Sequence, residues 1–154
     1  MLEKITNPER VKVVEGAIPV RHTYTAGVAG DRFFRTLRDE GTILATPCKS
    51  CGVVYVPGRM FCERCFAALN DWVEVGPGGR LESFTSVHID LDGRPLAEPQ
   101  WIGLVALDGA TTVLVHRLEA NGTAPTIGAR VEAVLEPKKR RTGSINDIRA
   151  FRIV

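Results

Sequence analysis

Alternating apolar and polar positions through the second half of the chain predict β-strands. Turn signals at Asp92-Gly93, Asp108-Gly109 and Asn121-Gly122 divide this region into short segments. We predict five strands, at residues 80–90, 101–107, 111–118, 130–136 and 147–154. Five short strands within about 75 residues are typical of a small closed barrel such as the OB-fold.

A helical pattern precedes the predicted barrel. Phe33, Phe34 and Leu37 share one face of a helix that Asp31 is suited to begin and Gly41 is suited to end. Residues 1–29 lack such signals, and the residue before Pro19 avoids the helical region of backbone space. We therefore expect an extended N-terminal arm, a short helix and then a strand at residues 42–46.

Two Cys-x-x-Cys pairs follow this strand. Cys48 and Cys51 form the first pair, Cys62 and Cys65 form the second, and ten residues separate the pairs. The two-residue gap lets both thiolates of a pair reach one metal ion, and two pairs at the ends of a hairpin complete a tetrahedral sulfur site. The sequence therefore predicts a rubredoxin-like zinc ribbon. Its zinc ion would be structural, because four thiolates leave no open position for a substrate.

Iron is the competing metal, because four thiolates also form rubredoxin-type iron centres. Rubredoxin-like pairs favour a glycine after the second cysteine, a condition that Gly52 meets and Phe66 does not. Disulfide bonds would need an oxidising compartment. The charged N-terminus is unlike a secretory signal, and no stretch is apolar enough to span a membrane. We expect a cytoplasmic protein with reduced cysteines.

These elements predict a mainly β protein in three parts: an N-terminal arm and helix at residues 1–41, a zinc ribbon at 42–75 and a five-stranded OB-fold barrel at 76–154. The chain offers few groups for catalysis. Its four cysteines are all assigned to the metal, so none remains as a nucleophile. Of its three histidines, His88 and His116 fall in predicted strands. We therefore expect no catalytic residues.

Positive charge is concentrated near the C-terminus. Residues 137–154 contain six basic residues and one acid, whereas residues 80–136 contain four basic residues and eight acids. Four of the basic residues are consecutive, at Lys138, Lys139, Arg140 and Arg141. Such a loop can bind the phosphates of a small ligand, a nucleic acid or an acidic protein surface, or it can simply be solvated.

The order of these parts resembles the zinc-ribbon/OB-fold proteins associated with thiolases, a family long described only as a domain of unknown function. The likeness covers residues 17–154. It rests on Arg32-Phe33-Phe34, the two cysteine pairs, the segment Tyr55-Val-Pro-Gly-Arg59 and the strand Gly79–Thr85. The chain departs from the family at Val56-Pro57, where two prolines are frequent, and at Glu63, where proline is frequent.

The resemblance implies a non-catalytic small subunit of a thiolase-type complex that forms or cleaves C–C bonds of acyl-CoA compounds. A thiolase-like partner would carry the catalytic residues, and this chain would assist complex assembly and binding of the CoA thioester. Forked arginine donors and lysine charges suit the CoA phosphates. The candidates for this contact are Arg59, Lys138, Lys139, Arg140 and Arg141.

A nucleic-acid-binding module is the alternative, because zinc ribbons and OB barrels both serve that function. The net charge of +2 and the aromatic content of 6% disfavour it. The predicted barrel has only Phe84, Trp101 and Phe151 for base stacking. We therefore expect a protein partner and acyl-CoA, and neither a nucleic acid nor a membrane.

Overall fold

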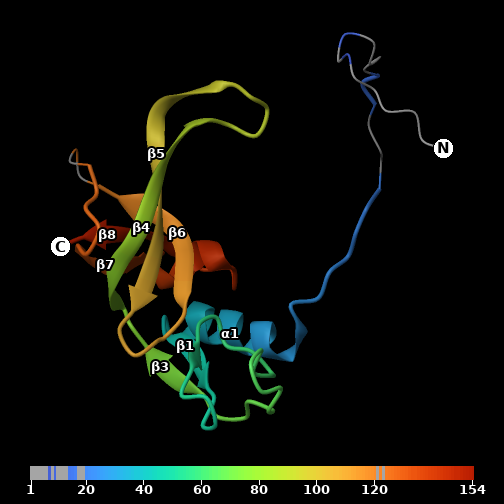
Figure 1. Cartoon of the computed structure of the whole chain (residues 1–154), viewed down its shortest axis with the longest axis vertical. Helices are drawn as coiled ribbons and strands as arrows, with labels where there is room; N and C mark the ends of the chain where they lie inside the picture. Colours follow the sequence, from blue (N-terminus) through green and yellow to red (C-terminus); the bar gives the residue numbers. More distant parts are fainter. Residues whose placement is uncertain (1–6, 8, 10–13, 17–19, 121, 123) are drawn as a thin grey trace.

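The structure is a computed structural model that describes residues 7, 9, 14–16, 20–120, 122 and 124–154 (Figure 1). Its elements, in chain order, are α1 (Gly27–Asp39), β1 (Ile43–Pro47), β2 (Val54–Tyr55), β3 (Val73–Val75), β4 (Gly78–Ile89), β5 (Pro95–Leu107), β6 (Val113–Glu119), β7 (Arg130–Leu135), the 3-10 turns η2 (Lys138–Arg140) and η3 (Ile145–Asp147), and β8 (Ile148–Ile153). No helix in the described ranges is long and apolar enough to cross a membrane.

Helix α1 begins earlier than the sequence pattern predicted. It starts at Gly27, and the predicted cap residue Asp31 lies inside the helix, where it pairs with Arg35 at 3.0 Å. The capping prediction is therefore wrong. The predicted end is confirmed, because Gly41 takes the left-handed φ of 79° that terminates helices. Ile18 and Pro19, on which the extended-arm prediction depended, lie outside the described residues; Val20–Ala26 form no regular element and are exposed.

The five strands after the ribbon close into a barrel in the order β4-β5-β6-β8-β7. All neighbours are antiparallel except β6 and β8, which pair in parallel through Leu118 and Phe151. This arrangement confirms the predicted mainly β fold with an OB-like barrel. The interior of the barrel is apolar, and Leu81, Val105 and Phe151 are fully buried in it.

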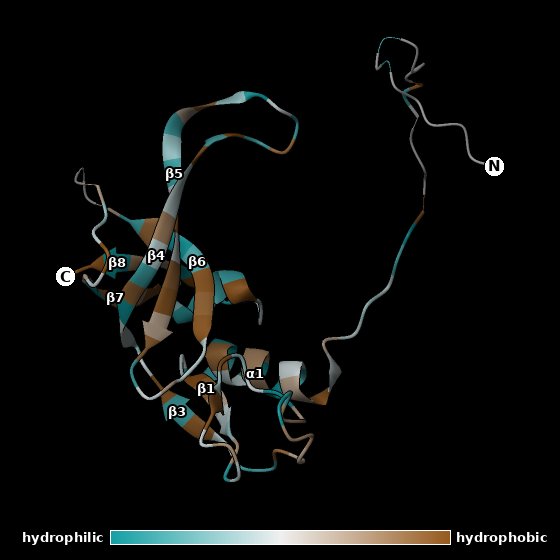
Figure 2. Ribbon diagram, in the orientation of Figure 1, coloured by the Kyte–Doolittle hydropathy of each residue, from teal (hydrophilic) through white to brown (hydrophobic). Residues whose placement is uncertain are grey.

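Strands β4 and β5 extend beyond the barrel as a long hairpin (Figure 1). Strand β5 begins at Pro95 rather than at the predicted Trp101, and Pro95 pairs with Ile89 after a register shift. Figure 2 shows that the distal part of β5 is largely hydrophilic, whereas β6 is mostly apolar where it crosses the barrel. The hairpin tip is thus exposed, and Leu91 there lies entirely in solvent.

Before the barrel, β1 forms a three-stranded sheet with β2 on one side and β3 on the other. Phe33 and Leu37 of α1 are fully buried and share one apolar cluster with β1 and the barrel interior. A second, smaller cluster lies inside the ribbon; it consists of Cys48, Val53, Tyr55, Cys62 and Leu69. The helix therefore closes one side of the main core, and the ribbon has a core of its own.

Candidate functional site

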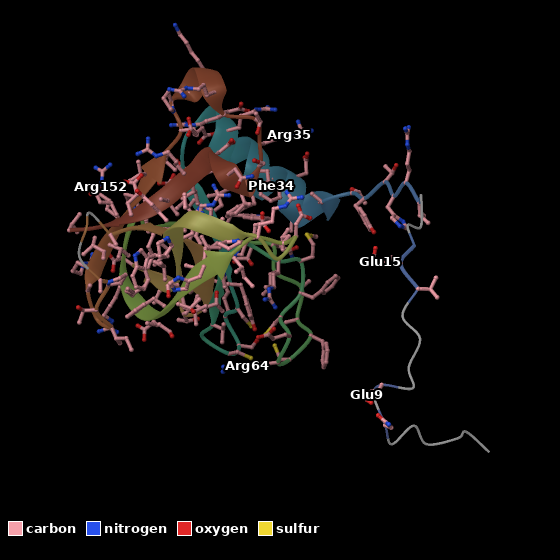
Figure 3. The ribbon with its side chains drawn as sticks, turned by 90° about the horizontal axis from the view of Figure 1, so that it is seen from above. Glu9, Glu15, Phe34, Arg35, Arg64 and Arg152 are labelled. Carbon is pink, nitrogen blue, oxygen red and sulfur yellow. The ribbon has the colours of Figure 1, made fainter. Side chains whose placement is uncertain are left out.

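The four cysteines of the ribbon converge on one point. Their Sγ atoms all lie within 4.8 Å of one another, with 3.6 Å between Cys48 and Cys65 and 3.9 Å between Cys51 and Cys62. A tetrahedral metal site with metal–sulfur bonds of about 2.3 Å places its sulfur atoms about 3.8 Å apart. The arrangement therefore fits a four-thiolate metal site. In Figure 3 the sulfur atoms of this site gather beside Arg64.

Both cysteine pairs have the same backbone turn. The amide of Gly52 donates to the Cys48 carbonyl at 2.8 Å, and that of Phe66 donates to the Cys62 carbonyl at 2.9 Å. Gly52 has a φ of 67° and Phe66 a φ of 59°. The second turn thus keeps the left-handed conformation that a glycine would favour, although its residue is a phenylalanine with 80% of its surface exposed.

The sulfur of Cys62 is the most deeply held of the four. It is fully buried, and the hydroxyl of Tyr55 lies 3.2 Å from it. The backbone amide of Arg64 donates to the same sulfur at 3.4 Å. The hydrogen bond from Tyr55, more than any other cause, lowers the pKa of Cys62 to about 6, and the same bond raises the pKa of Tyr55 to about 12. The surroundings therefore favour a thiolate at Cys62.

The basic loop forms the short turn η2. Lys138, Lys139 and Arg140 are exposed on it, and Arg140 lies 3.8 Å from Glu136. Within the described residues, Lys138 and Lys139 form no ion pair with an acid of the chain. These three cations are thus brought together at one surface.

The other two phosphate candidates have partners within the chain. Arg141 is half-buried, donates from Nε to the Glu136 carbonyl at 2.8 Å and packs over Gly41 at the end of α1. Arg59 belongs to the ribbon, where it pairs with Glu63 at 2.6 Å and stacks on the ring of Tyr55. No hydrogen bond or ion pair in the described part of the chain joins Arg59 to the basic loop.

The loop after Arg141 is fixed by Asp147, which the sequence interpretation did not single out. Asp147 is 2% exposed, and its carboxylate accepts the backbone amides of Thr142 and Gly143, each at 2.8 Å. The segment Thr142–Ser144 is therefore anchored to the start of β8. In the sequence, the one indication of this contact is an acid three residues after a Thr-Gly-Ser run.

The two histidines that were predicted to lie in strands do so, His88 in β4 and His116 in β6. His116 is buried and hydrogen-bonded to the carbonyl of Ile148. The ring of His88 contacts the Ser86 hydroxyl at 2.9 Å near the exposed end of β4, and no acid among the described residues orients the imidazole. Phe84 and Trp101 pack edge to face, with ring centroids 5.7 Å apart, and Phe151 is fully buried.

The fold and the sulfur site together define a zinc ribbon joined to an OB-fold barrel. Residues 35–70 match the family described as ChsH2, rubredoxin-like zinc ribbon domain, and residues 72–136 match ChsH2, C-terminal OB-fold domain. The chain therefore belongs to the ChsH2-like zinc-ribbon/OB-fold family. This result supports a structural zinc ion at the four cysteines.

Relatives of this chain are found among archaeal proteins and in a solved enzyme complex. A Methanocaldococcus jannaschii protein described as a DUF35 domain-containing scaffold protein is 23% identical over 67% of this chain and 74% of its own length. A DUF35-family crystal structure from Sulfolobus solfataricus is 26% identical, covers 82% of this chain and 84% of its own, and has a TM-score of 0.62. A chain of the Ltp2-ChsH2(DUF35) aldolase is 22% identical, covers 79% and 91%, and has a TM-score of 0.55.

Proposed function

We propose that this protein is the non-catalytic small subunit of a thiolase-type or aldolase-type complex acting on acyl-CoA compounds. The observation that carries the proposal is the convergence of all four cysteines on one closed metal site. Because all four cysteines would bind the metal, no free thiol is left for acyl transfer. Its similarity to a protein described as a scaffold protein and to a chain of an aldolase supports the same role.

The metal in this proposal is zinc, bound once per chain and structural. Metal analysis of the purified protein should give one zinc equivalent. The visible absorbance of a ferric four-thiolate centre would instead identify iron. A cytoplasmic location agrees with this proposal, since four reduced thiolates persist best in a reducing compartment.

The subunit role is tested by copurification from the native cells, followed by reconstitution. The tagged chain should bring down a thiolase-like protein, and the recombinant pair should turn over acyl-CoA substrates faster than either chain alone. The isolated chain should have no thiolase or hydrolase activity. Turnover by the isolated chain at about 1 per second or faster, the range of ordinary enzymes, would contradict the proposal.

Within this function, Lys138, Lys139 and Arg140 are our principal candidates for contacting the CoA phosphates. They are exposed and adjacent on η2, and the contact of Arg140 with Glu136 is long, at 3.8 Å, whereas Arg59 and Arg141 have close partners within the chain. Their charge suits a pyrophosphate, and screening by salt should weaken the contact.

Charge reversal at Lys138 and Lys139 separates the possible roles of η2. If η2 binds CoA, the complex should persist while the apparent KM for the acyl-CoA rises, most strongly at low salt. If η2 instead binds an acidic surface of the partner, the complex itself should dissociate more readily. Arg94→Glu, which makes the same kind of change on the exposed β4–β5 hairpin, is the matched control. An unchanged KM and an unchanged complex would identify η2 as solvated surface.

Nucleic-acid binding remains the second candidate because the barrel is of the OB type. The three barrel aromatics argue against it, since Phe84 and Trp101 pack on each other and Phe151 is buried. Fluorescence anisotropy with single-stranded oligonucleotides at physiological salt tests it. Binding tighter than the micromolar range of non-specific association would favour this alternative.

A further inference from the structure

A buried tyrosine next to the metal site has no role in the function proposed above. Tyr55 is fully buried, and it is one of only two tyrosines in the chain. A buried phenolic hydroxyl needs a hydrogen-bond partner, because desolvating it without one is unfavourable. The hydroxyl of Tyr55 has the sulfur of Cys62 as its hydrogen-bond partner, at 3.2 Å.

The main chain around Tyr55 fixes the position of its ring. Tyr55 belongs to β2, and it pairs with Thr46 of β1 directly before the first cysteine pair. The hydroxyl of Thr46 also accepts the amide of Arg59 at 2.8 Å, which anchors the chain as it returns toward Cys62. The guanidinium of Arg59 covers the ring at 5.0 Å and is itself held by Glu63. The hydroxyl is therefore aimed at the sulfur by a rigid frame.

The four sulfur atoms differ in their surroundings. Of the described cysteines, Cys62 alone has hydrogen-bond partners outside the sulfur cluster, the Tyr55 hydroxyl and the Arg64 amide. Cys62 is also fully buried, whereas Cys65 is exposed to water. Four thiolates around a divalent ion carry a net charge of −2, and for a buried sulfur protein dipoles take the place of water in stabilising this excess charge.

We propose that Tyr55 is a positioning residue of the metal site, which donates its hydroxyl hydrogen to the metal-bound Cys62 thiolate and thereby slows loss of the metal. A thiolate that accepts a hydrogen bond donates less electron density to the metal, yet its orientation is fixed and its burial is tolerated. Partners of metal ligands typically alter metal affinity by about 10–100-fold when they are removed.

Tyr55→Phe tests this role, because it removes only the hydroxyl and keeps the ring under Arg59. The rate of zinc release from the full-length protein to a chromogenic chelator should rise about tenfold or more. Tyr24→Phe is the matched control, since it removes the same hydroxyl from a tyrosine that is 85% exposed, and its release rate should equal that of the unaltered protein. Equal release rates for Tyr55→Phe and the unaltered protein would overturn the proposal.

Cobalt(II) substitution separates a hydrogen bond from simple packing. Loss of a donor to the thiolate should move the sulfur-to-cobalt charge-transfer band to lower energy in Tyr55→Phe. Faster release with an unshifted band would mean that the residue acts by packing, and the proposal would be wrong.

A stronger donor at the same position tests the proposal even if Tyr55→Phe binds no metal. Biosynthetic 3-fluorotyrosine in the Tyr24→Phe background alters only residue 55, and its more acidic hydroxyl should shift the band in the opposite direction and slow the release. Unchanged release and an unchanged band in the fluorinated protein would also overturn the proposal.

Discussion

The ribbon and the barrel are stabilised by different means. The ribbon buries a small cluster that includes two of its own metal ligands, Cys48 and Cys62. The barrel shares with α1 and β1 a continuous core of large apolar side chains, among them Phe33 and Phe151. A small module cannot bury enough apolar surface to fold alone, so a metal supplies the missing free energy. We therefore expect loss of the metal to damage the ribbon and mutations in the main core to damage the barrel.

The two regions are joined along one edge of the ribbon. The hydroxyl of Thr111 accepts the amide of Val54 at 2.7 Å, and that of Thr112 accepts the amide of Val56 at 2.8 Å. Val56 also lies in the main core. Strand β2 is therefore attached to the barrel, whereas the second cysteine pair depends on the metal. Loss of the metal should free the chain around Cys62 first.

The largest effect is expected from Cys62→Ser. A structural zinc contributes about 10–16 kcal/mol of binding free energy in zinc-finger peptides, and loss of one thiolate removes much of it. Hydrogen exchange should therefore become fast at residues 59–71 while β4–β8 stay protected. Unaltered protein treated with a chelator should give the same pattern. Equal protection of both regions in the variant would show that the ribbon does not depend on its metal.

Phe151→Ala should damage the other region. Phe151 is fully buried in the barrel, and truncation of such a side chain typically destabilises by about 3–5 kcal/mol. The urea midpoint of the barrel should fall, while one zinc equivalent remains bound under native conditions. Phe61→Ala, at an exposed position of the ribbon, is the control and should leave the barrel midpoint unchanged. A loss of zinc in parallel with the barrel transition would mean that the two regions unfold as one unit.

His116 provides a pH-dependent test of the barrel alone. Burial lowers the pKa of His116 below its ordinary value of 6.5; the bond to the Ile148 carbonyl, the next largest cause, opposes this shift, and the neighbouring Arg117 adds to it. Between the two pKa values, His116 is protonated in the unfolded chain and neutral in the folded barrel. Stability is therefore complete above about pH 6.5 and falls as the pH decreases from there toward the pKa of the folded state, by at most about 1.4 kcal/mol per pH unit.

The measurement uses Trp101 fluorescence in a Trp72→Phe background, so that the barrel is observed separately from the ribbon. His116→Gln should flatten the dependence of the unfolding free energy on pH below 6.5. His88→Gln removes an exposed imidazole and should keep the original slope. An equal slope in both variants would exclude His116 as its source.

Several elements could be predicted from local sequence, whereas others depended on distant contacts. The cysteine spacing was sufficient for the ribbon, and Gly41 was sufficient for the end of α1. The start of α1 was missed because Ala26 is a poor N-cap and Gly27 and Gly30 are weak helix formers. The helix is instead stabilised by Phe33 and Leu37, which are buried in the main core. The parallel pairing of β6 with β8 joins residues far apart in the chain, which no local pattern encodes.

At the metal site and the basic loop, too, some features follow from local sequence and others depend on the fold. The four ligands follow from spacing alone. The hydroxyl of Tyr55 reaches Cys62 only because β2 pairs with β1, so its role was hidden until the fold was known. The basic run Lys138–Arg141 reads as four equivalent cations in the sequence. In the fold, Arg141 turns back to the Glu136 carbonyl, while Lys138 and Lys139 stay exposed. The directions of their side chains distinguish Arg141 from the two lysines, and these directions cannot be predicted from the composition of the run.

The smallest expected effect comes from Phe66→Gly, which compares the two cysteine turns within the ribbon. Phe66 has a left-handed φ of 59°, close to the 67° of Gly52 in the first turn, and such a conformation strains a side-chain-bearing residue by about 1–2 kcal/mol. The phenyl ring is 80% exposed, so little packing is lost with it. Glycine gives the unfolded chain more entropy, which offsets about 0.5–1 kcal/mol of the relief. The zinc-loaded ribbon should therefore gain roughly 0.5 kcal/mol in urea unfolding. Gly52→Ala is the reciprocal variant: a Cβ there meets no atom within 4 Å, so its destabilisation of about 1 kcal/mol measures backbone strain, less the entropy that the unfolded chain loses with the glycine, and involves no clash. If Phe66→Gly destabilises the ribbon while Gly52→Ala behaves as expected, the phenyl ring contributes packing that outweighs the strain, and the two turns are not equivalent.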